Sequence, residues 1–152
     1  MLGRTLESPF GQVSFMVEND RLARIQFEAN PNLLDEGDPL LDETARQLTA
    51  YFAGKLYDFD LPLAAPHSTF QARIRRCMIE IPYGRMRTYG ELAAELGSAS
   101  QAVGQSCGSN PIPIVVPCHR VVASGGKLGG FSGSDGAPTK KKLLNHEAVH
   151  AP

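Results

Sequence analysis

The sequence predicts a chain of two parts. The first is a small α/β domain with a β-hairpin or small sheet and one helix, and the second is a mainly helical domain with a helix-turn-helix. Apolar residues alternate with polar ones in the first part, whereas their spacing becomes helical after residue 68. A proline-containing stretch with neither pattern separates them. We therefore expect domains at 1–60 and 68–152, joined by a linker at 61–67.

A β-hairpin is predicted near the beginning of the chain. Its alternating apolar positions are Val13, Phe15 and Val17 on the outgoing strand and Ala23, Ile25 and Phe27 on the return strand. Asn19-Asp20 lies between the two runs, and these residue types tolerate the left-handed backbone of a tight turn. The apolar side chains of both strands should therefore face a common core.

One helix should follow the hairpin, because signals for its start and its end are both present. Asp38 is suited to the N-cap position and Pro39 to the first turn, while Gly54 supplies the stop. The apolar stripe consists of Leu41, Ala45, Leu48 and Phe52.

The second part carries the signals of a helix-turn-helix. Two capping boxes mark helix starts, namely Ser68 with Gln71 and Thr88 with Glu91. Gly97 ends the second of these helices, and a further small-residue segment runs from Gln101 to about Gly108. This pattern is typical of a helix-turn-helix, although helical hairpins that never touch DNA share it.

The segment 110–117 should be an extended apolar strap, because its three prolines exclude a regular helix. As an apolar segment it should be buried and deliver Cys118 into the protein. A long glycine-rich loop at 124–138 follows, of a length that is often functional. A last helix is predicted at about 139–148, with the lysines at 140–142 on a solvated face.

Charge is distributed unevenly over the chain. Residues 1–66 carry 5 Lys and Arg against 11 Asp and Glu, and residues 67–152 carry 10 against 5. A basic half beside an acidic half raises the question of nucleic acid, but two differently solvated surfaces explain it equally well.

Composition excludes several classes of protein. The 42% apolar content suffices for a core, and no apolar run approaches the roughly 20 residues that span a bilayer. The first ten residues do not resemble a signal peptide, so a cytoplasmic protein with reduced cysteines is expected. We expect no metal, because the cysteines and histidines lack finger spacing; Cys77 and Cys107 are expected in the core.

Cys118 and His119 are the residues most suited to chemistry. A cysteine is a nucleophile as thiolate, and a nearby imidazole can take its proton directly or through water. Taken alone, a buried cysteine beside a histidine that caps another group is the commoner explanation of such a pair.

A series of motifs adds to this pair. They are Ile81-Pro-Tyr-Gly84, Thr88-Tyr-Gly-Glu-Leu-Ala93, Ala102-Val-Gly104, Asn110-Pro-Ile-Pro-Ile-Val-Val-Pro-Cys-His-Arg-Val-Val122, Leu128-Gly-Gly-Phe131 and Leu143-Leu-Asn-His-Glu147. In this order they resemble the O6-alkylguanine-DNA alkyltransferases, also called methylated-DNA–protein cysteine methyltransferases. The resemblance covers about 80 residues, and it implies that the second domain is winged-helix-like.

The resemblance implies a DNA repair reaction with one turnover and no cofactor. Cys118 would take the alkyl group from O6-alkylguanine, or from O4-alkylthymine as an open alternative. His119 would take the thiol proton through a water, and Glu147 would orient that histidine. Tyr89 would help to protonate the leaving guanine, and Asn110 would brace the turn that holds the cysteine.

The resemblance also implies how DNA is bound. The helix-turn-helix would enter the minor groove of double-stranded DNA as a monomer and flip the damaged nucleotide into a pocket. The sequence leaves open whether several molecules line up along DNA. The residues implied in DNA or base contacts are Thr88, Gln101, Ala102, Val103, Gly104, Arg120, Val121, Phe131 and Ser132.

One departure from the family pattern falls on the DNA-binding element. Gln101 stands where the family usually has an arginine, which fills the gap left by the flipped nucleotide. We therefore expect weaker or differently organised DNA binding. A non-catalytic lesion sensor is the alternative function, but such proteins usually replace the motif cysteine, which is intact here. A helix-turn-helix regulator and a cysteine hydrolase have less support.

Overall fold

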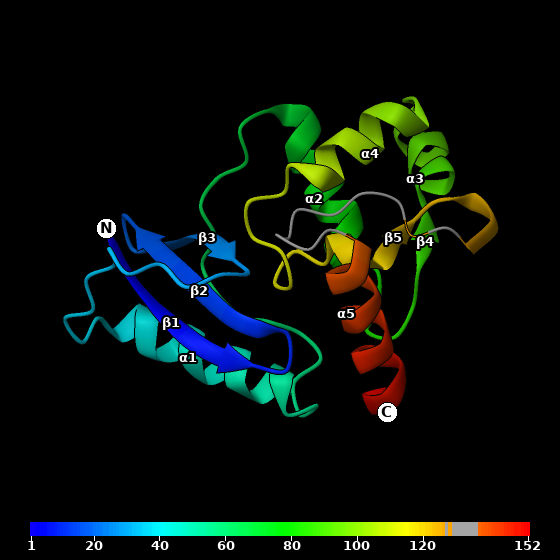
Figure 1. The fold of residues 1–152 in the computed structure, drawn as a ribbon. Coiled ribbons are helices and arrows are strands. Elements are labelled where there is room, and N and C mark those ends of the chain that lie inside the picture. Colours follow the sequence, from blue (N-terminus) through cyan, green and yellow to red (C-terminus); the bar gives the residue numbers. More distant parts are fainter. Residues whose placement is uncertain (127, 129–136) are drawn as a thin grey trace.

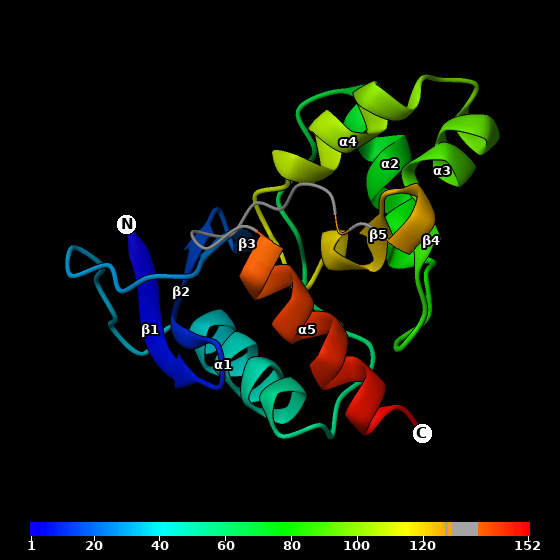
Figure 2. The same ribbon diagram turned by 45° about the vertical axis from the view of Figure 1, so that its right-hand side comes forward.

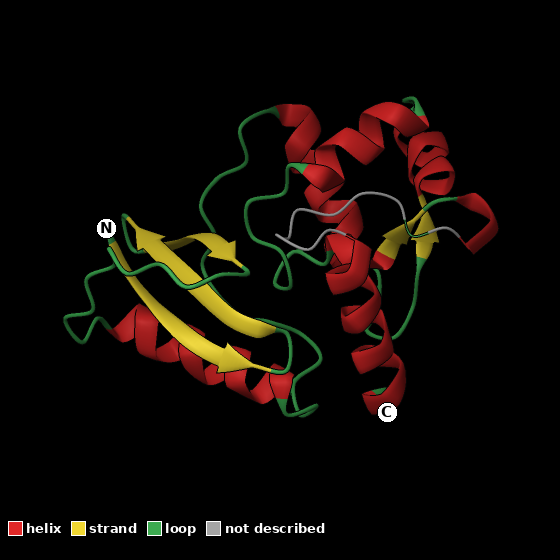
Figure 3. Cartoon of the chain, viewed as in Figure 1, coloured by secondary structure: helices red, strands yellow, loops and turns green. Residues whose placement is uncertain are grey.

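The computed structural model describes residues 1–126, 128 and 137–152. Strands β1 (Leu2–Ser8), β2 (Gly11–Glu18) and β3 (Arg21–Gln26) form an antiparallel sheet in the order β1-β2-β3. Helix α1 (Pro39–Phe52) packs against this sheet, and a group of helices forms the other half of the molecule (Figures 1 and 3). The predicted fold class, a small sheet with one helix beside a mainly helical part, is confirmed.

The sheet differs from the predicted hairpin in two respects. Strand β1 was not predicted, and its pairing makes β2 the central strand, so Ser14 and Met16 are buried as well as their apolar neighbours. A bulge at Met16/Val17 sets Leu22 opposite Val17. Leu22 is therefore fully buried and Ala23 only half-buried, contrary to the alternation that we expected. The predicted turn is confirmed, with φ of 53° at Asn19 and 59° at Asp20.

Helix α1 begins as predicted. The Asp38 side chain accepts hydrogen bonds from the backbone N–H groups of Leu40 and Leu41. Its buried face is rotated slightly from the predicted stripe, because Tyr51 is fully buried whereas Phe52 is half-buried. This rotation turns a phenol hydroxyl, rather than a purely apolar ring, towards the second half of the molecule.

The second half is built from short elements. Its helices are α2 (Thr69–Ile79), α3 (Tyr89–Leu96), α4 (Ser100–Gly108) and α5 (Ala137–His150), with short 3₁₀ turns at Cys118–Arg120 and Ser124–Gly126. Strands β4 (Arg87–Thr88) and β5 (Val121–Val122) pair in parallel. In Figure 2, α5 runs between α1 and the other helices. The ring of His146 on α5 lies against the ring of Tyr51 on α1, with centroids 5.3 Å apart.

Helices α3 and α4 form the predicted helix-turn-helix. Thr88 and Glu91 make a complete capping box at the start of α3. Gly97 adopts a left-handed conformation at its end, with φ of 65°, a backbone shape that costs glycine little. Helix α4 follows after a short turn, and its N-cap residue, Ala99, has only a methyl group to offer.

The predicted linker lies along β3. The N–H of Leu22 donates to the Pro62 carbonyl, and the N–H of Ala64 donates to the Leu22 carbonyl, each at 2.8 Å. The strap also meets this strand, since Ile25 donates to the Pro111 carbonyl at 3.0 Å. One hydrophobic core runs through both halves. The division into 1–60, 61–67 and 68–152 stays a prediction.

A buried cysteine beside a histidine, arginine and glutamate cluster

The strap at residues 110–117 carries Cys118 into the interior. Asn110 holds the strap from within, because its amide donates to the Val116 carbonyl at 2.8 Å and its side-chain oxygen accepts from the N–H of Ile112 at 3.1 Å. Ile112 and Val116 are fully buried. Asn110 thus replaces the backbone partners that the strap's prolines cannot supply.

Ile114 stores strain in this strap. Its φ is 73°, and a β-branched side chain in the left-handed region costs on the order of 1–3 kcal/mol. Burial of the Ile114 side chain and the hydrogen bond from Val116 N to Ile112 O, 2.9 Å long, hold this conformation in place. The strain therefore belongs to the turn that fixes the position of Cys118.

Cys118, His119 and Arg120 form a single 3₁₀ turn rather than an extended chain. Cys118 is 1% exposed, His119 0% and Arg120 4%. The tight turn lets three successive side chains enter the interior together, which an extended segment would not allow.

Glu147 of α5 is the centre of a polar cluster around this turn. Its carboxylate accepts from His119 Nε2 at 2.6 Å, from Arg120 Nε at 2.8 Å and Nη2 at 3.0 Å, from Tyr51 Oη at 2.7 Å, and from the Gly84 N–H at 3.3 Å. These contacts fill its acceptor positions. Burial alone would raise the pKa of Glu147, but the hydrogen bonds and charges of His119 and Arg120 hold that pKa well below its usual range.

The ionised carboxylate sets the protonation of His119. Because Glu147 can only accept, His119 Nε2 carries the proton that it donates to Glu147. Burial lowers the pKa of His119 and outweighs the opposite effect of Glu147, so the ring is neutral near pH 7. Nδ1 is then an unprotonated acceptor, and it has no hydrogen-bond partner among the described residues.

Lys140 corrects the prediction of a solvated lysine face. Its side chain is fully buried, while Lys141 and Lys142 are exposed as expected. The ammonium group donates to the hydroxyl of Tyr89 at 3.0 Å and to the Val121 carbonyl. Burial lowers the pKa of Lys140 to about 8. A run of three lysines on a helix of low amphipathicity gave no sign of which one turns inward.

Two residues that were predicted to contact DNA have buried side chains. The Val103 side chain is 0% exposed and belongs to the core. Arg120 holds Glu147 and donates to the Ile81 carbonyl at 2.7 Å, so its guanidinium is committed to the interior. Sequence spacing alone did not show that these two side chains turn inward.

The other predicted contact residues lie on and around the helix-turn-helix. Gln101 is exposed and Ala102 and Gly104 are half-buried on α4, while Thr88 caps α3. The N–H of Val121, another residue predicted to contact the base, donates to the Cys118 carbonyl. Phe131 and Ser132 lie outside the described residues.

The other cysteines are core thiols, as predicted. Cys77 is 8% exposed and Cys107 is fully buried. Burial raises the pKa of Cys107 to about 12, which keeps it protonated. In the described part of the chain there is no cluster of three metal-ligating side chains, and no helix there is long and apolar enough to cross a membrane.

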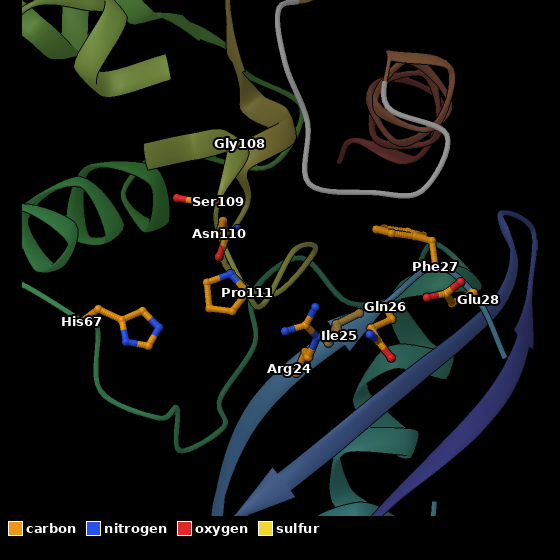
Figure 4. A pocket seen from close by; sticks show the side chains of 10 residues that line it. All are labelled: Arg24, Ile25, Gln26, Phe27, Glu28, His67, Gly108, Ser109, Asn110 and Pro111. Carbon is orange, nitrogen blue, oxygen red and sulfur yellow. The ribbon is translucent and has the colours of Figure 1, made fainter. Parts of the chain in front are cut away.

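A cavity of about 390 Å³ lies between the end of β3 and the segment that contains Asn110 (Figure 4). Residues 24–28, at the end of β3 and just after it, face the segment from Gly108 to Pro111 across it. Among the described residues, these two segments and His67 line the cavity. The cavity therefore borders the brace of the strap and not the Cys118 sulfur.

The fold and the site define a helix-turn-helix protein with a buried cysteine beside a histidine–glutamate pair. Residues 69–149 match the DNA binding domain of 6-O-methylguanine DNA methyltransferase, and residues 1–65 match its ribonuclease-like domain. The chain belongs to the 6-O-methylguanine DNA methyltransferase family.

Relatives along the full length agree with this assignment. The chain is 40% identical over 156 residues to a methylated-DNA–protein-cysteine methyltransferase of Mycolicibacterium paratuberculosis, covering 98% of this chain and 93% of that protein. The chain is also 40% identical over 149 residues to a methylated-DNA–protein-cysteine methyltransferase of Methanosarcina acetivorans, covering 93% of this chain and 94% of that protein. The structure of Mycobacterium tuberculosis OGT in complex with DNA matches with a TM-score of 0.86 and 37% identity, covering 100% and 96%.

The sequence analysis did not predict two buried residues of the site, Tyr51 beside Glu147 and Lys140 beside Tyr89. Tyr51 lies 96 positions before Glu147 in the chain, and no local pattern links the two. The only available signal was a tyrosine within an otherwise apolar helix face, which is usually an ordinary core residue.

Proposed function

We propose that this chain repairs DNA by direct reversal, as a methylated-DNA–protein cysteine S-methyltransferase. The alkyl group of O6-alkylguanine is transferred to Cys118 in one displacement. The bond from sulfur to the alkyl carbon forms as the bond from that carbon to O6 breaks, and the thiol proton passes in net terms to the departing guanine. The thioether is stable, so each molecule acts once. The observation that carries the proposal is the buried Cys118–His119–Glu147 arrangement in a member of this family.

His119 is the base for the thiol. Its Nδ1 has no hydrogen-bond partner among the residues that the structure describes, and its Nε2–H donates to Glu147. This is the tautomer that a general base needs. We propose that a water carries the proton from Cys118 to Nδ1. Arg120 balances the charge of Glu147, so the carboxylate orients the ring without taking its proton.

Positioning contributes more than ionisation. A cysteine of ordinary pKa, about 8.5, is roughly a tenth or less thiolate near neutrality, so complete ionisation gains only about one to two orders of magnitude. Holding the thiol in line with the alkyl carbon contributes far more through effective molarity. The braced and strained strap from Asn110 to Pro117 supports this role.

Tyr89 and Lys140 assist the departing guanine. The Lys140 ammonium lies 3.0 Å from the Tyr89 oxygen, and a positive charge there stabilises the negative charge that a phenol acquires as it gives up its proton. We propose that Tyr89 donates to the guanine and that Lys140 makes this donation easier.

The helix-turn-helix binds double-stranded DNA in this proposal. Helix α4 enters the minor groove, and the damaged nucleotide is flipped towards Cys118, because the O6 of a stacked base is not open to in-line attack. Exposed Gln101 and the adjoining half-buried Ala102 and Gly104 form the surface that meets DNA. Action as a monomer and a cytoplasmic location stay predictions, as does the acceptance of O4-alkylthymine.

Intact mass spectrometry after incubation with an O6-methylguanine oligonucleotide tests the proposal. We expect a gain of one methyl group on Cys118, complete loss of that gain in Cys118→Ser, and a slower gain in His119→Ala, by about one to two orders of magnitude. An unchanged mass in wild type that still binds the lesion would replace this proposal with a lesion sensor.

A further inference from the structure

We infer that Tyr51, a residue of the ribonuclease-like half, is a positioning residue for alkyl transfer and acts through Glu147. The inference rests on the proposed function of the His119–Glu147 pair. Tyr51 lies on α1, which carries none of the motifs that identify the family's reaction site in this sequence. Its hydroxyl nevertheless donates to Glu147 Oε2 at 2.7 Å.

In the hydrogen bond between Tyr51 and Glu147, the Tyr51 hydroxyl is always the donor. Tyr51 is fully buried, and burial together with the negative charge of Glu147 raises its pKa well above the usual value. The hydroxyl therefore keeps its proton at any working pH. Because the ionised carboxylate has no proton to give, Tyr51 is always the donor in this pair.

Tyr51 and His119 share one oxygen of the carboxylate. Oε2 accepts from His119 Nε2 at 2.6 Å, from the Tyr51 hydroxyl at 2.7 Å and from Arg120 Nη2 at 3.0 Å. Oε1 accepts from Arg120 Nε and from the Gly84 N–H. The Tyr51 hydrogen bond withdraws electron density from the atom that polarises His119. It also fixes the carboxylate rotation that aims this oxygen at the imidazole.

The aromatic surroundings hold the Tyr51 ring firmly. Phe59, Tyr83 and His146 lie against it with ring centroids 5.5, 6.1 and 5.3 Å away. His146 Nε2 also lies 2.9 Å from the Tyr51 carbonyl, which ties α1 to α5 next to Glu147. The hydroxyl is thus delivered by a packed ring and not by a mobile side chain.

The charged groups around the pair set the direction of the expected effect. His119 and Glu147 are faced by Arg120 from the 3₁₀ turn, by Lys140 from α5, by Tyr51 from α1 and by Tyr83 from the segment after α2. Cys118 of the same turn faces Lys140. Loss of the Tyr51 hydroxyl leaves Oε2 a stronger acceptor, so the protonated imidazole is stabilised. His119 then holds its second proton at a higher pH, and less of the neutral base remains.

Tyr51→Phe tests this, with Tyr83→Phe as a matched control. Each substitution removes one phenol hydroxyl and keeps the ring, and the two rings are neighbours in the same aromatic cluster. The Tyr83 hydroxyl is buried without a hydrogen-bond partner in the described part of the chain, so its removal breaks no contact there. The single-turnover rate of methyl transfer to Cys118 is measured by intact mass from the lowest pH at which the proteins stay folded up to pH 9, and thermal unfolding at each pH verifies that each variant is folded.

We expect the acid side of the Tyr51→Phe profile to move up by as much as about one pH unit. On the acid side of the profile the variant should therefore be slower by up to about tenfold, and it should approach the wild-type rate at pH 9. Tyr83→Phe should follow the wild-type profile. A folded Tyr51→Phe with an unchanged profile, or one slowed equally at every pH, would overturn the inference. An inactive wild type would instead overturn the proposed function.

Discussion

The acceptor site and the helix-turn-helix satisfy their polar groups in opposite ways. At the acceptor site, Glu147 receives hydrogen bonds from four residues of three separate segments of the chain. On α4, the N-cap position is filled by Ala99 and the side chain of Gln101 is exposed. The Glu147 carboxylate completes its interactions within the protein, whereas the start of α4 leaves its polar groups open to a partner.

This difference predicts which measured quantity, folding stability or affinity for DNA, a substitution in each region should change. A buried group with full pairing loses its compensation when one partner is removed, so the change appears in folding stability. An exposed group on a binding helix has little to lose in the free protein, so the change appears in the affinity for DNA.

The largest effect is expected for Arg120→Met. The substitution retains an apolar stem but leaves the buried Glu147 carboxylate without its balancing charge. Breaking a buried pair in this way costs about 3–5 kcal/mol of the free energy of unfolding. Urea denaturation followed by circular dichroism measures this loss.

The double variant Arg120→Met, Glu147→Gln is the control for that experiment. A neutral amide needs no balancing charge, so the double variant should lose less stability than the sum of the two single variants. Strict additivity would contradict the view that Arg120 serves mainly to compensate Glu147.

The next largest effect concerns Lys140 and depends on pH. The folded pKa of Lys140 is lowered to about 8 from an ordinary value of 10.5. Between these values the unfolded chain binds the proton and the folded chain does not, so the stability of wild type relative to Lys140→Met must rise with pH. The slope cannot exceed about 1.4 kcal/mol per pH unit, the value for one proton.

Unfolding free energies of the two proteins at pH 7, 8, 9 and 10 provide this measurement. Lys142→Met is the matched control, because Lys142 is exposed on the same helix. Parallel curves for wild type and Lys140→Met would mean that the Lys140 ammonium is well solvated, against its burial. A rising difference would confirm that burial of the Lys140 ammonium lowers the stability of the folded protein.

The fold could be predicted from the sequence wherever local signals decide it. Asp38, the Thr88–Glu91 box and Gly97 mark helix ends by chemistry that is complete within a few residues. Strand β1 could not be predicted, because its residues are mixed in character and become a strand only by pairing with β2. The bulge that buries Leu22 instead of Ala23 is likewise a property of the pairing.

The residues of the site likewise differ in whether the sequence alone could predict them. Cys118, His119 and Asn110 stand together in one motif, so the sequence predicts them as a unit. The place of Arg120 inside the cluster and the inward turn of Lys140 depend on packing between distant segments. Tyr51 reaches Glu147 from the other half of the molecule, and no spacing rule connects them. Residues that complete a buried charge are therefore found only in the folded protein.

A smaller effect is expected for Ala99→Ser. Ala99 has φ of −93° and ψ of 145°, the extended geometry of an N-cap residue, but its methyl group cannot accept a hydrogen bond. A serine there should accept from the first turn of α4 and stabilise the protein by about 1 kcal/mol. Ala102→Ser, inside the same helix, should be neutral or slightly destabilising in the same thermal unfolding experiment. Equal effects of both changes would show that the start of α4 does not need a cap.

The smallest effect is expected for Gln101→Arg, and it separates the two regions most directly. Gln101 is exposed, so the added charge should leave the free energy of unfolding unchanged. If α4 meets DNA, the charge should add one phosphate contact and make the salt dependence steeper by about 0.9 in log–log slope. Between 50 and 200 mM salt, the variant should then lose about 3.5-fold more affinity than wild type. Fluorescence anisotropy with a labelled duplex measures this, and Gln101→Met, which is of similar length but neutral, should keep the wild-type slope. Identical slopes for all three proteins would mean that DNA does not approach α4 at this position, and the open polar groups of the helix-turn-helix would then need another partner.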